Sequence, residues 1–268
     1  MPSIAQLHSW SREFIVFGVK EARACIFAGS FFSLLFISKY LPLGEFARYD
    51  FLFISAVLLQ ITLYLTKVET WNEVKTIFLF HVIGFVLETF KTHPAVGSWS
   101  YPEPGFFTVG TVPLFAGFMY AAVGSYIAQA WRILKLELKG FPPYSWMLVL
   151  CVAIYANFFT NHFIPDLRLI LILAVFLLFA RTTVHFTVVR ARRYMPLALG
   201  FCLTAFFIWI AENISTFYGA WQYPDQVHVW SVVSTGKITS WFLLVIISFI
   251  IIAYLKYYKA VHAKRRAA

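Results

Sequence analysis

The sequence predicts an all-α fold: a polytopic membrane helix bundle of about eight transmembrane helices, arranged as two parallel four-helix repeats with an N-terminal interfacial helix. Three observations support this fold class. The 268 residues are 60% hydrophobic and 13% charged, whereas soluble globular chains contain about 25% charged residues. Eight apolar runs approach the roughly 20 residues that a helix needs to cross a bilayer core. One polar corner between two such runs occurs twice.

The elements follow from apolar runs and periodicity. At about 100° per residue, Trp10, Phe14 and Phe17 share one side of residues 1–24, which predicts an amphipathic helix lying in the membrane interface. The predicted spans are 25–43, 47–66, 72–91, 106–131, 144–163, 166–187, 196–217 and 237–258. They divide the chain into a first repeat (25–143), a second repeat (144–258) and a basic cytoplasmic tail (259–268).

The net charge of +10 is explained by membrane topology. Most of the 22 lysines and arginines lie on the side that holds both termini and the loops after the second, fourth and sixth spans, among them Arg190, Arg192 and Arg193. The positive-inside rule therefore predicts that both termini are cytoplasmic. Because topology accounts for the basic residues, nucleic acid is excluded as a partner.

The repeated corner runs from Glu88 to Glu103 and again, two residues shorter, from Glu212 to Asp225. The matching pairs in the loops are Gly97 and Gly219, Trp99 and Trp221, Tyr101 and Tyr223, and Pro102 and Pro224. With an even number of predicted spans per repeat, the two copies have the same orientation and both corners lie on the external side. Their aromatic rings either anchor the loops at the membrane interface or line the entrance of a binding site, where they stack on an unsaturated or cationic ligand.

Glu88 and Glu212 are the leading catalytic candidates. A charge at the bilayer centre costs about 3 kcal/mol, and less near the interface, so two equivalent glutamates at helix ends indicate carboxyl groups facing a shared polar cavity. Burial favours the neutral acid, which can donate a proton. The alternatives are that each glutamate holds its own loop, that Lys91 neutralises Glu88 locally, or that the pair carries ions or protons.

A second candidate cluster lies in the hairpin between the fifth and sixth spans. Asn157 and Asn161 are one helical turn apart, and His162, Asp166 and Arg168 follow. Helix capping and a local Asp166–Arg168 pair are the structural alternative. The predicted catalytic residues are therefore Glu88, Glu212, His162 and Asp166. The predicted substrate-binding residues are Trp99, Tyr101, Asn157, Asn161, Arg168, Trp221, Tyr223, Lys91 and Asn213.

Metal and cofactor signals are weak. The three cysteines lie in or beside apolar runs without the spacing of a disulfide framework or zinc site. A single metal held by His162, Asp166 and a glutamate is an alternative. No phosphate-binding loop, dinucleotide fingerprint or nucleophile elbow occurs, so no cofactor is predicted.

The corner from Glu88 and the segment from Asn157 to Arg168 together resemble the YoaT-like family of bacterial membrane proteins of unknown function. This resemblance implies a multi-pass protein of the bacterial inner membrane. A fainter likeness, carried by Glu88, Gly97, Trp99, Tyr101 and Val112-Pro113-Leu114, is to membrane carotenoid hydratases and lycopene cyclases. It implies acid-initiated chemistry on a polyene, with an aromatic site that steadies a cation.

Two functions remain open. One is an enzyme that performs acid–base chemistry on a membrane lipid or isoprenoid at the outer-leaflet side. The other is a small-molecule or proton-coupled transporter, or a lipid-binding membrane protein, in which the carboxyl groups bind an ion or proton.

Overall fold

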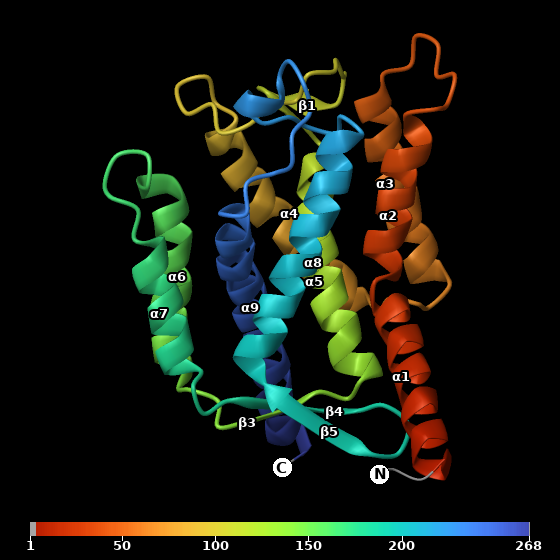
Figure 1. Cartoon of the computed structure of the whole chain (residues 1–268), viewed down its shortest axis with the longest axis vertical. Coiled ribbons are helices and arrows are strands. Elements are labelled where there is room, and N and C mark those ends of the chain that lie inside the picture. The colour runs from red at the N-terminus through yellow and green to blue at the C-terminus, as the bar shows by residue number, and fades with distance from the viewer. Residues whose placement is uncertain (1–3, 268) are drawn as a thin grey trace.

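The computed structural model describes residues 4–267, with side chains described from residue 10 to residue 256. Its helices lie mostly along one long axis (Figure 1). They are α1 (Ile4–Ala24), α2 (Ile26–Ser38), α3 (Arg48–Leu65), α4 (Trp71–Lys91), α5 (Ala116–Ile133), α6 (Tyr144–Thr160), α7 (Arg168–Leu178), α8 (Leu197–Phe217), η1 (Pro224–Gln226) and α9 (Lys237–Ala267). The strands are β1 (Thr108–Val109), β2 (Val112–Pro113), β3 (Glu137–Lys139), β4 (Thr183–Thr187) and β5 (Arg192–Pro196).

Among the described residues, three helices are long and apolar enough to cross a membrane: α3, α8 and the Lys237–Lys256 part of α9. A fourth span results if α1 and α2, which meet at a bend of 67°, act as one. Each predicted span overlaps one of the helices α2 to α9. However, α6 and α7 are apolar but shorter than 18 residues. The mostly helical class is confirmed, and the number of spans remains a prediction.

Two predicted helices are too long. The 106–131 span begins as helix only at Ala116, because β1 and β2 form a tight turn before it with Gly110 at φ +61°. The 166–187 span ends at Leu178, and the chain continues into β4. Thr183, Val184 and Thr187 are β-branched and favour a strand over a helix.

The strands β3, β4 and β5 form an antiparallel sheet that an all-α prediction does not contain. Figure 1 shows this sheet at the end of the bundle where both ends of the described chain lie. The loops 92–115 and 218–236 lie at the opposite end. The predicted basic tail, 259–268, has its side chains outside the described part of the chain.

The helix predicted at residues 1–24 is present as α1, and it packs against the bundle. Ala24 is fully buried, and Phe17 packs against Phe186 of β4 with 5.8 Å between ring centroids. The Lys20 amine also donates to the Thr187 carbonyl at 2.9 Å. One side of α1 therefore faces protein.

Glycine allows α4 and α5 to approach closely. A Cβ atom on Gly84 would lie 2.3 Å from Cγ of Tyr120, and one on Gly124 would lie 2.2 Å from the ring of Phe80. Such contacts are far inside van der Waals distance. Gly84 therefore sets where the Tyr120 side chain lies, and Tyr120 belongs to the site described next.

Candidate functional site

The two repeated corners have matching backbones. Gly97 and Gly219 both adopt positive φ, +56° and +68°, which glycine accepts without steric cost. The amide after each glycine donates back to the end of the preceding helix, from Ser98 to the Lys91 carbonyl at 2.9 Å and from Ala220 to the Ser215 carbonyl at 3.0 Å. The second corner is two residues shorter and still makes the equivalent bond.

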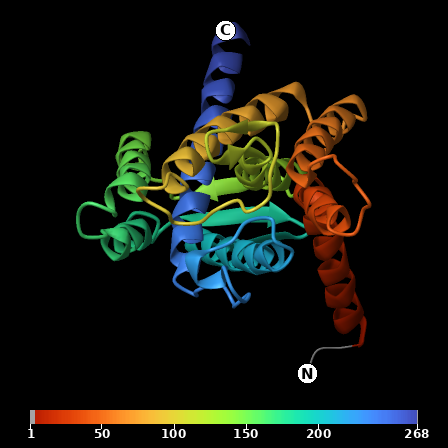
Figure 2. The same cartoon turned by 90° about the horizontal axis from the view of Figure 1, so that it is seen from above.

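The corners meet over the end of the bundle. Ser100 and Gln222 exchange both backbone hydrogen bonds, at 2.9 and 3.0 Å, in an antiparallel bridge. Figure 2 shows the two loops crossing the bundle side by side when it is seen from above. Trp99 packs edge-on against Tyr223, with 6.1 Å between centroids. The Lys237 amine lies 4.1 Å from the Tyr223 ring centroid and 5.3 Å from that of Trp99.

Glu88 is buried at the end of α4 and accepts three hydrogen bonds from aromatic side chains. Oε2 accepts from Trp99 Nε1 and from the Tyr101 hydroxyl, both at 2.8 Å, and Oε1 accepts from the Tyr120 hydroxyl at 2.7 Å. Burial and the Glu88 carboxyl raise the pKa of Tyr101 well above its usual value. Tyr101 therefore remains a protonated donor.

Glu212 is buried at the equivalent place in α8 and accepts two hydrogen bonds. Oε1 accepts from the Tyr223 hydroxyl at 2.5 Å, and Oε2 accepts from Trp241 Nε1 at 2.8 Å. Tyr223 corresponds to Tyr101, and Trp241 in α9 stands where Tyr120 stands in α5. Burial and the neighbouring Glu212 raise the pKa of Tyr223 well above its usual value.

Both glutamates line one cavity of about 680 Å³. Its walls come mainly from α1, α2, α5 and α8, and Trp99, Trp221, Tyr223 and Trp241 also line it. Lining residues on α8 extend from Gly200 to Ser215, which is about 22 Å of helix. Phe14 and Phe207 line the cavity while 77% and 64% exposed. The cavity is therefore elongated and opens sideways between α1 and α8.

The structure does not bring the hairpin between α6 and α7 to this cavity. Asn157 donates to Asp166 at 3.1 Å and accepts from the Leu167 amide at 3.0 Å. Asp166 pairs with Arg168 at 2.9 Å, and Arg168 also donates to Thr239 of α9 at 3.2 Å. Burial opposes ionisation of Asp166, but the bonds from Asn157 and Arg168 outweigh it and lower its pKa. These contacts match the capping alternative.

Lys91 points away from Glu88 toward the same hairpin. Its amine lies 2.7 Å from His162 Nε2 and donates to Asn161 Oδ1 at 3.2 Å. Burial and the positive charges of Lys91 and Lys237 lower the pKa of His162. His162, Asn161 and Lys91 thus tie the first corner to the hairpin, and none of the three lines the cavity.

Asn213 follows Glu212 in the chain but lines a groove separate from this cavity. It donates to the Trp209 carbonyl at 2.8 Å and accepts from the Val233 amide at 2.9 Å. It lines an open groove of about 730 Å³ between α2 and α8, which shares Phe32 with the cavity. Its bonds hold the loop after the second corner.

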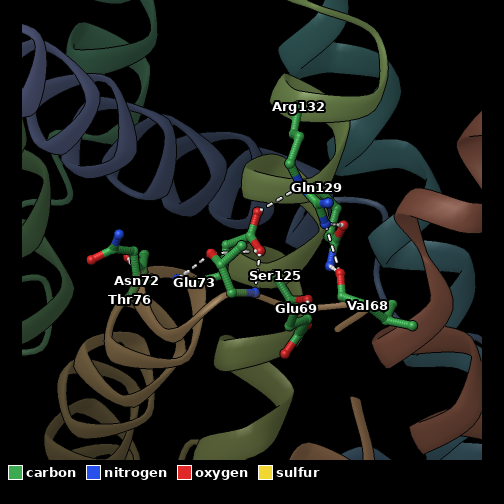
Figure 3. Close-up of polar contacts among 9 residues, drawn as sticks. Val68, Glu69, Asn72, Glu73, Thr76, Ser125, Gln129 and Arg132 are labelled. Atoms are coloured by element: carbon green, nitrogen blue, oxygen red, sulfur yellow. Dashed lines mark hydrogen bonds and ion pairs between the residues drawn. The ribbon is translucent and has the colours of Figure 1, made fainter. Parts of the chain in front are cut away.

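A further polar cluster joins the turn before α4 to α5 (Figure 3). Arg132 pairs with Glu73 at 3.1 Å and donates to the Val68 carbonyl at 2.6 Å. The buried Glu69 accepts from Ser125 at 2.6 Å. Thr70 and Glu73 form a capping box at the start of α4. This cluster was not predicted from the sequence.

Across the described residues, no three His, Cys, Asp or Glu side chains are grouped closely enough to hold a metal ion. The alternative metal set of His162, Asp166 and a glutamate is therefore not assembled among the described residues. Cys25 lines the cavity, and Cys151 and Cys202 are free thiols elsewhere in the bundle.

Tyr120, Trp241 and Lys237 are site residues that sequence reasoning missed. The signal was available, because Tyr120 follows Tyr101, and Trp241 follows Tyr223, at nearly the same spacing. Comparing the helices after the two corners would have found both donors. Lys237 has no such counterpart, and only the folded loops place it over Trp99 and Tyr223.

Comparisons with known proteins identify the family but no activity. A family model described as a protein of unknown function (DUF817) matches residues 13–249. The uncharacterized protein YoaT of Bacillus subtilis (strain 168) is 50% identical over 248 residues, which cover 92% of this chain and 93% of YoaT. No solved structure matches the chain. The YoaT-like resemblance is confirmed, and these matches give the carotenoid-enzyme likeness no support.

Proposed function

The chain belongs to the DUF817 family of unknown function, and on that premise we propose that it binds a lipid or isoprenoid in the membrane and performs acid–base chemistry on it at Glu212. The observation that carries this proposal is the elongated, aromatic-lined cavity with two buried carboxyl groups near one end. Ligand sites are typically apolar with a few placed polar groups. The sideways opening suits a ligand that enters from the bilayer.

The proposal includes a membrane arrangement. We propose eight spans, an internal duplication centred on the two corners, and both termini in the cytoplasm of a bacterial cell. The matched corner backbones and the reciprocal Ser100–Gln222 bridge support the duplication. The orientation is supported by Arg192 and Arg193 of β5, in the sheet at the end of the bundle that holds both ends of the described chain.

The proposed chemistry starts with a proton on Glu212. The proton moves to one carbon of a double bond, which leaves a carbocation on the other carbon. The aromatic faces of Trp221 and Trp241 stabilise this positive charge. Loss of a neighbouring proton, or addition of water followed by loss of one of its protons, returns a neutral product and restores the acid. Tyr223 and Trp241 stabilise the carboxylate between these steps.

Transport is the competing function, and the corners argue against it. A transported solute would have to pass between loops that are joined by the Ser100–Gln222 bridge and covered by Lys237. A proton flux across liposomes that depends on Glu212 would support transport and contradict the enzymatic proposal.

The first experiment tests ligand binding. The protein is purified in mild detergent and its bound lipids are extracted and identified by mass spectrometry. Ala211→Phe fills the cavity from α8, and Ala156→Phe adds the same bulk on an exposed face of α6. We expect Ala211→Phe to lower the co-purified apolar ligand several-fold and Ala156→Phe to leave it unchanged. Equal ligand in all three proteins would overturn the proposal.

The second experiment tests the chemistry. Glu212→Gln keeps the shape of the side chain but removes its ionisable proton. We expect this variant to retain the ligand and to lose conversion by at least about 100-fold, the usual contribution of a general acid. Glu88→Gln is the matched variant and should retain most conversion. Unchanged conversion in Glu212→Gln would assign Glu212 to the scaffold.

A further inference from the structure

The cavity has a second polar region that the proposed acid chemistry does not use. Glu21 of α1, Tyr126 of α5 and Thr204 of α8 all line it. On α8, Thr204 is nearer than Glu212 to strand β5, which leads directly into this helix. Between this region and the buried glutamates the lining is apolar, with Val123 on α5 and Phe207, Ile208 and Ala211 on α8. Three helices therefore place polar atoms close together in the wall of an otherwise apolar cavity.

The Glu21 carboxyl is only partly satisfied by protein. The Tyr126 hydroxyl donates to Oε2 at 3.0 Å, and Thr204 interacts with the same hydroxyl. The described residues supply no partner for Oε1. A carboxylate can accept about four hydrogen bonds, and the half-buried Glu21 lines the cavity. The free oxygen can accept a bond from a bound molecule.

Fastening α1 to the bundle does not account for Glu21. Arg193 of β5 already pairs with Glu13 at 2.6 Å, and Lys20 donates to the Thr187 carbonyl. Phe17 packs on Phe186. These contacts hold α1 next to the sheet, and Glu21 joins α1 to α5 through Oε2 alone, so attachment does not account for Oε1.

The spacing of the two polar regions follows from helix geometry. Thr204 and Glu212 are eight residues apart on α8, which is about 12 Å at 1.5 Å per residue. Tyr126 and Tyr120 are six residues apart on α5, which is about 9 Å. A molecule that reaches both regions therefore needs polar ends about 10 Å apart along an apolar chain.

We infer that Glu21, Tyr126 and Thr204 form a second ligand subsite, and that the ligand is an apolar chain with a hydroxyl or another hydrogen-bond donor at each end. This inference rests on the proposed ligand-binding function of the cavity and narrows its ligand class. The donor at one end bonds to Glu21 Oε1, and the other end lies at the Glu88 and Glu212 carboxyl groups.

The test compares 1-octanol with 1,8-octanediol, whose oxygens span a similar distance, on the full-length protein in lipid nanodiscs. Dissociation constants are measured from tryptophan fluorescence, since Trp99, Trp221 and Trp241 line the cavity. Glu21→Leu and Thr204→Val remove the subsite in separate variants. Thr160→Val is the matched control, because Thr160 on α6 makes the same bond to its own helix, 3.1 Å against 2.9 Å for Thr204.

We expect the ratio of the two dissociation constants to favour the diol, and each subsite variant to reduce that preference by about fivefold to tenfold. The control should keep the preference. If both probes bind and the ratio is the same in every variant, the second subsite is overturned while the cavity remains a ligand site. If neither probe binds to wild type, the proposed function fails and the subsite fails with it.

Discussion

The two corners have matching backbone geometry, but their glutamates accept different numbers of hydrogen bonds. Glu88 accepts three aromatic hydrogen bonds, whereas Glu212 accepts two. A carboxylate has about four acceptor positions, so Glu212 keeps more capacity for a ligand. The difference indicates that one copy of the corner holds the structure together and that the other is available for chemistry.

The two corners also differ in the neighbouring elements that they contact. Lys91 of the first corner reaches the hairpin through His162, whereas Ser215, at the equivalent position in the second corner, bonds to the Ala211 carbonyl of its own helix at 3.0 Å. The first corner is therefore tied to α6 and α7 as well as to α5. The second corner is tied instead to α3, where Arg48 donates to the Tyr218 and Gly219 carbonyls at 3.0 and 3.3 Å.

The largest expected effect comes from removing each carboxyl group. Glu88→Leu leaves Trp99, Tyr101 and Tyr120 without their acceptor and should lower the free energy of unfolding by about 4 kcal/mol. Glu212→Leu leaves two donors unpaired and should cost about 2 kcal/mol. Thermal unfolding in detergent measures both. A larger loss for Glu212→Leu would reverse the assignment of roles.

A smaller effect is expected from crowding the first corner alone. Gly84→Ala puts a methyl group 2.3 Å from Cγ of Tyr120, which must move away from Glu88. We expect a loss of about 2 kcal/mol from this overpacking, read from the same unfolding curves. Gly29→Ala in α2 has open space around its Cβ and should be neutral or slightly stabilising. Equal melting temperatures for the two variants would show that Tyr120 is not held in place by Gly84.

The smallest effect is a pH dependence at His162, in the hairpin to which the first corner is tied. The pKa of His162 is lowered in the folded protein by burial and by Lys91 and Lys237, whereas an unfolded histidine titrates near 6.5. The unfolded chain then binds the proton more readily, so stability should decrease as the pH falls below about 6.5.

The measurement for this dependence is the melting temperature between about pH 7.5 and pH 5.5. His162→Gln should make the decrease shallower than it is in the wild-type protein. If the slope survives in His162→Gln, the dependence arises from other groups and the tie between Lys91 and His162 is not its source.

Part of the site could be predicted from the sequence because the corner motif occurs twice. Glu88 and Glu212 stand at equivalent helix ends, and both are buried and line one cavity. The hairpin residues gave a signal of the same kind, yet His162 and Asp166 lie outside the cavity. A dense set of polar residues in one stretch reflects local capping as readily as a shared site, and spacing along the chain does not separate the two.

The amino-acid sequence by itself determined the helical class, the approximate positions of the helices and the pairing of Gly97 with Gly219. These depend on local propensity, apolar run length and repetition, which neighbouring residues decide. Only the tertiary structure decided that Tyr120 and Trp241 satisfy the two glutamates, that Lys237 covers the joined corners and that Glu21 faces the cavity. Those contacts join residues far apart in the chain, so they depend on how the helices pack against one another.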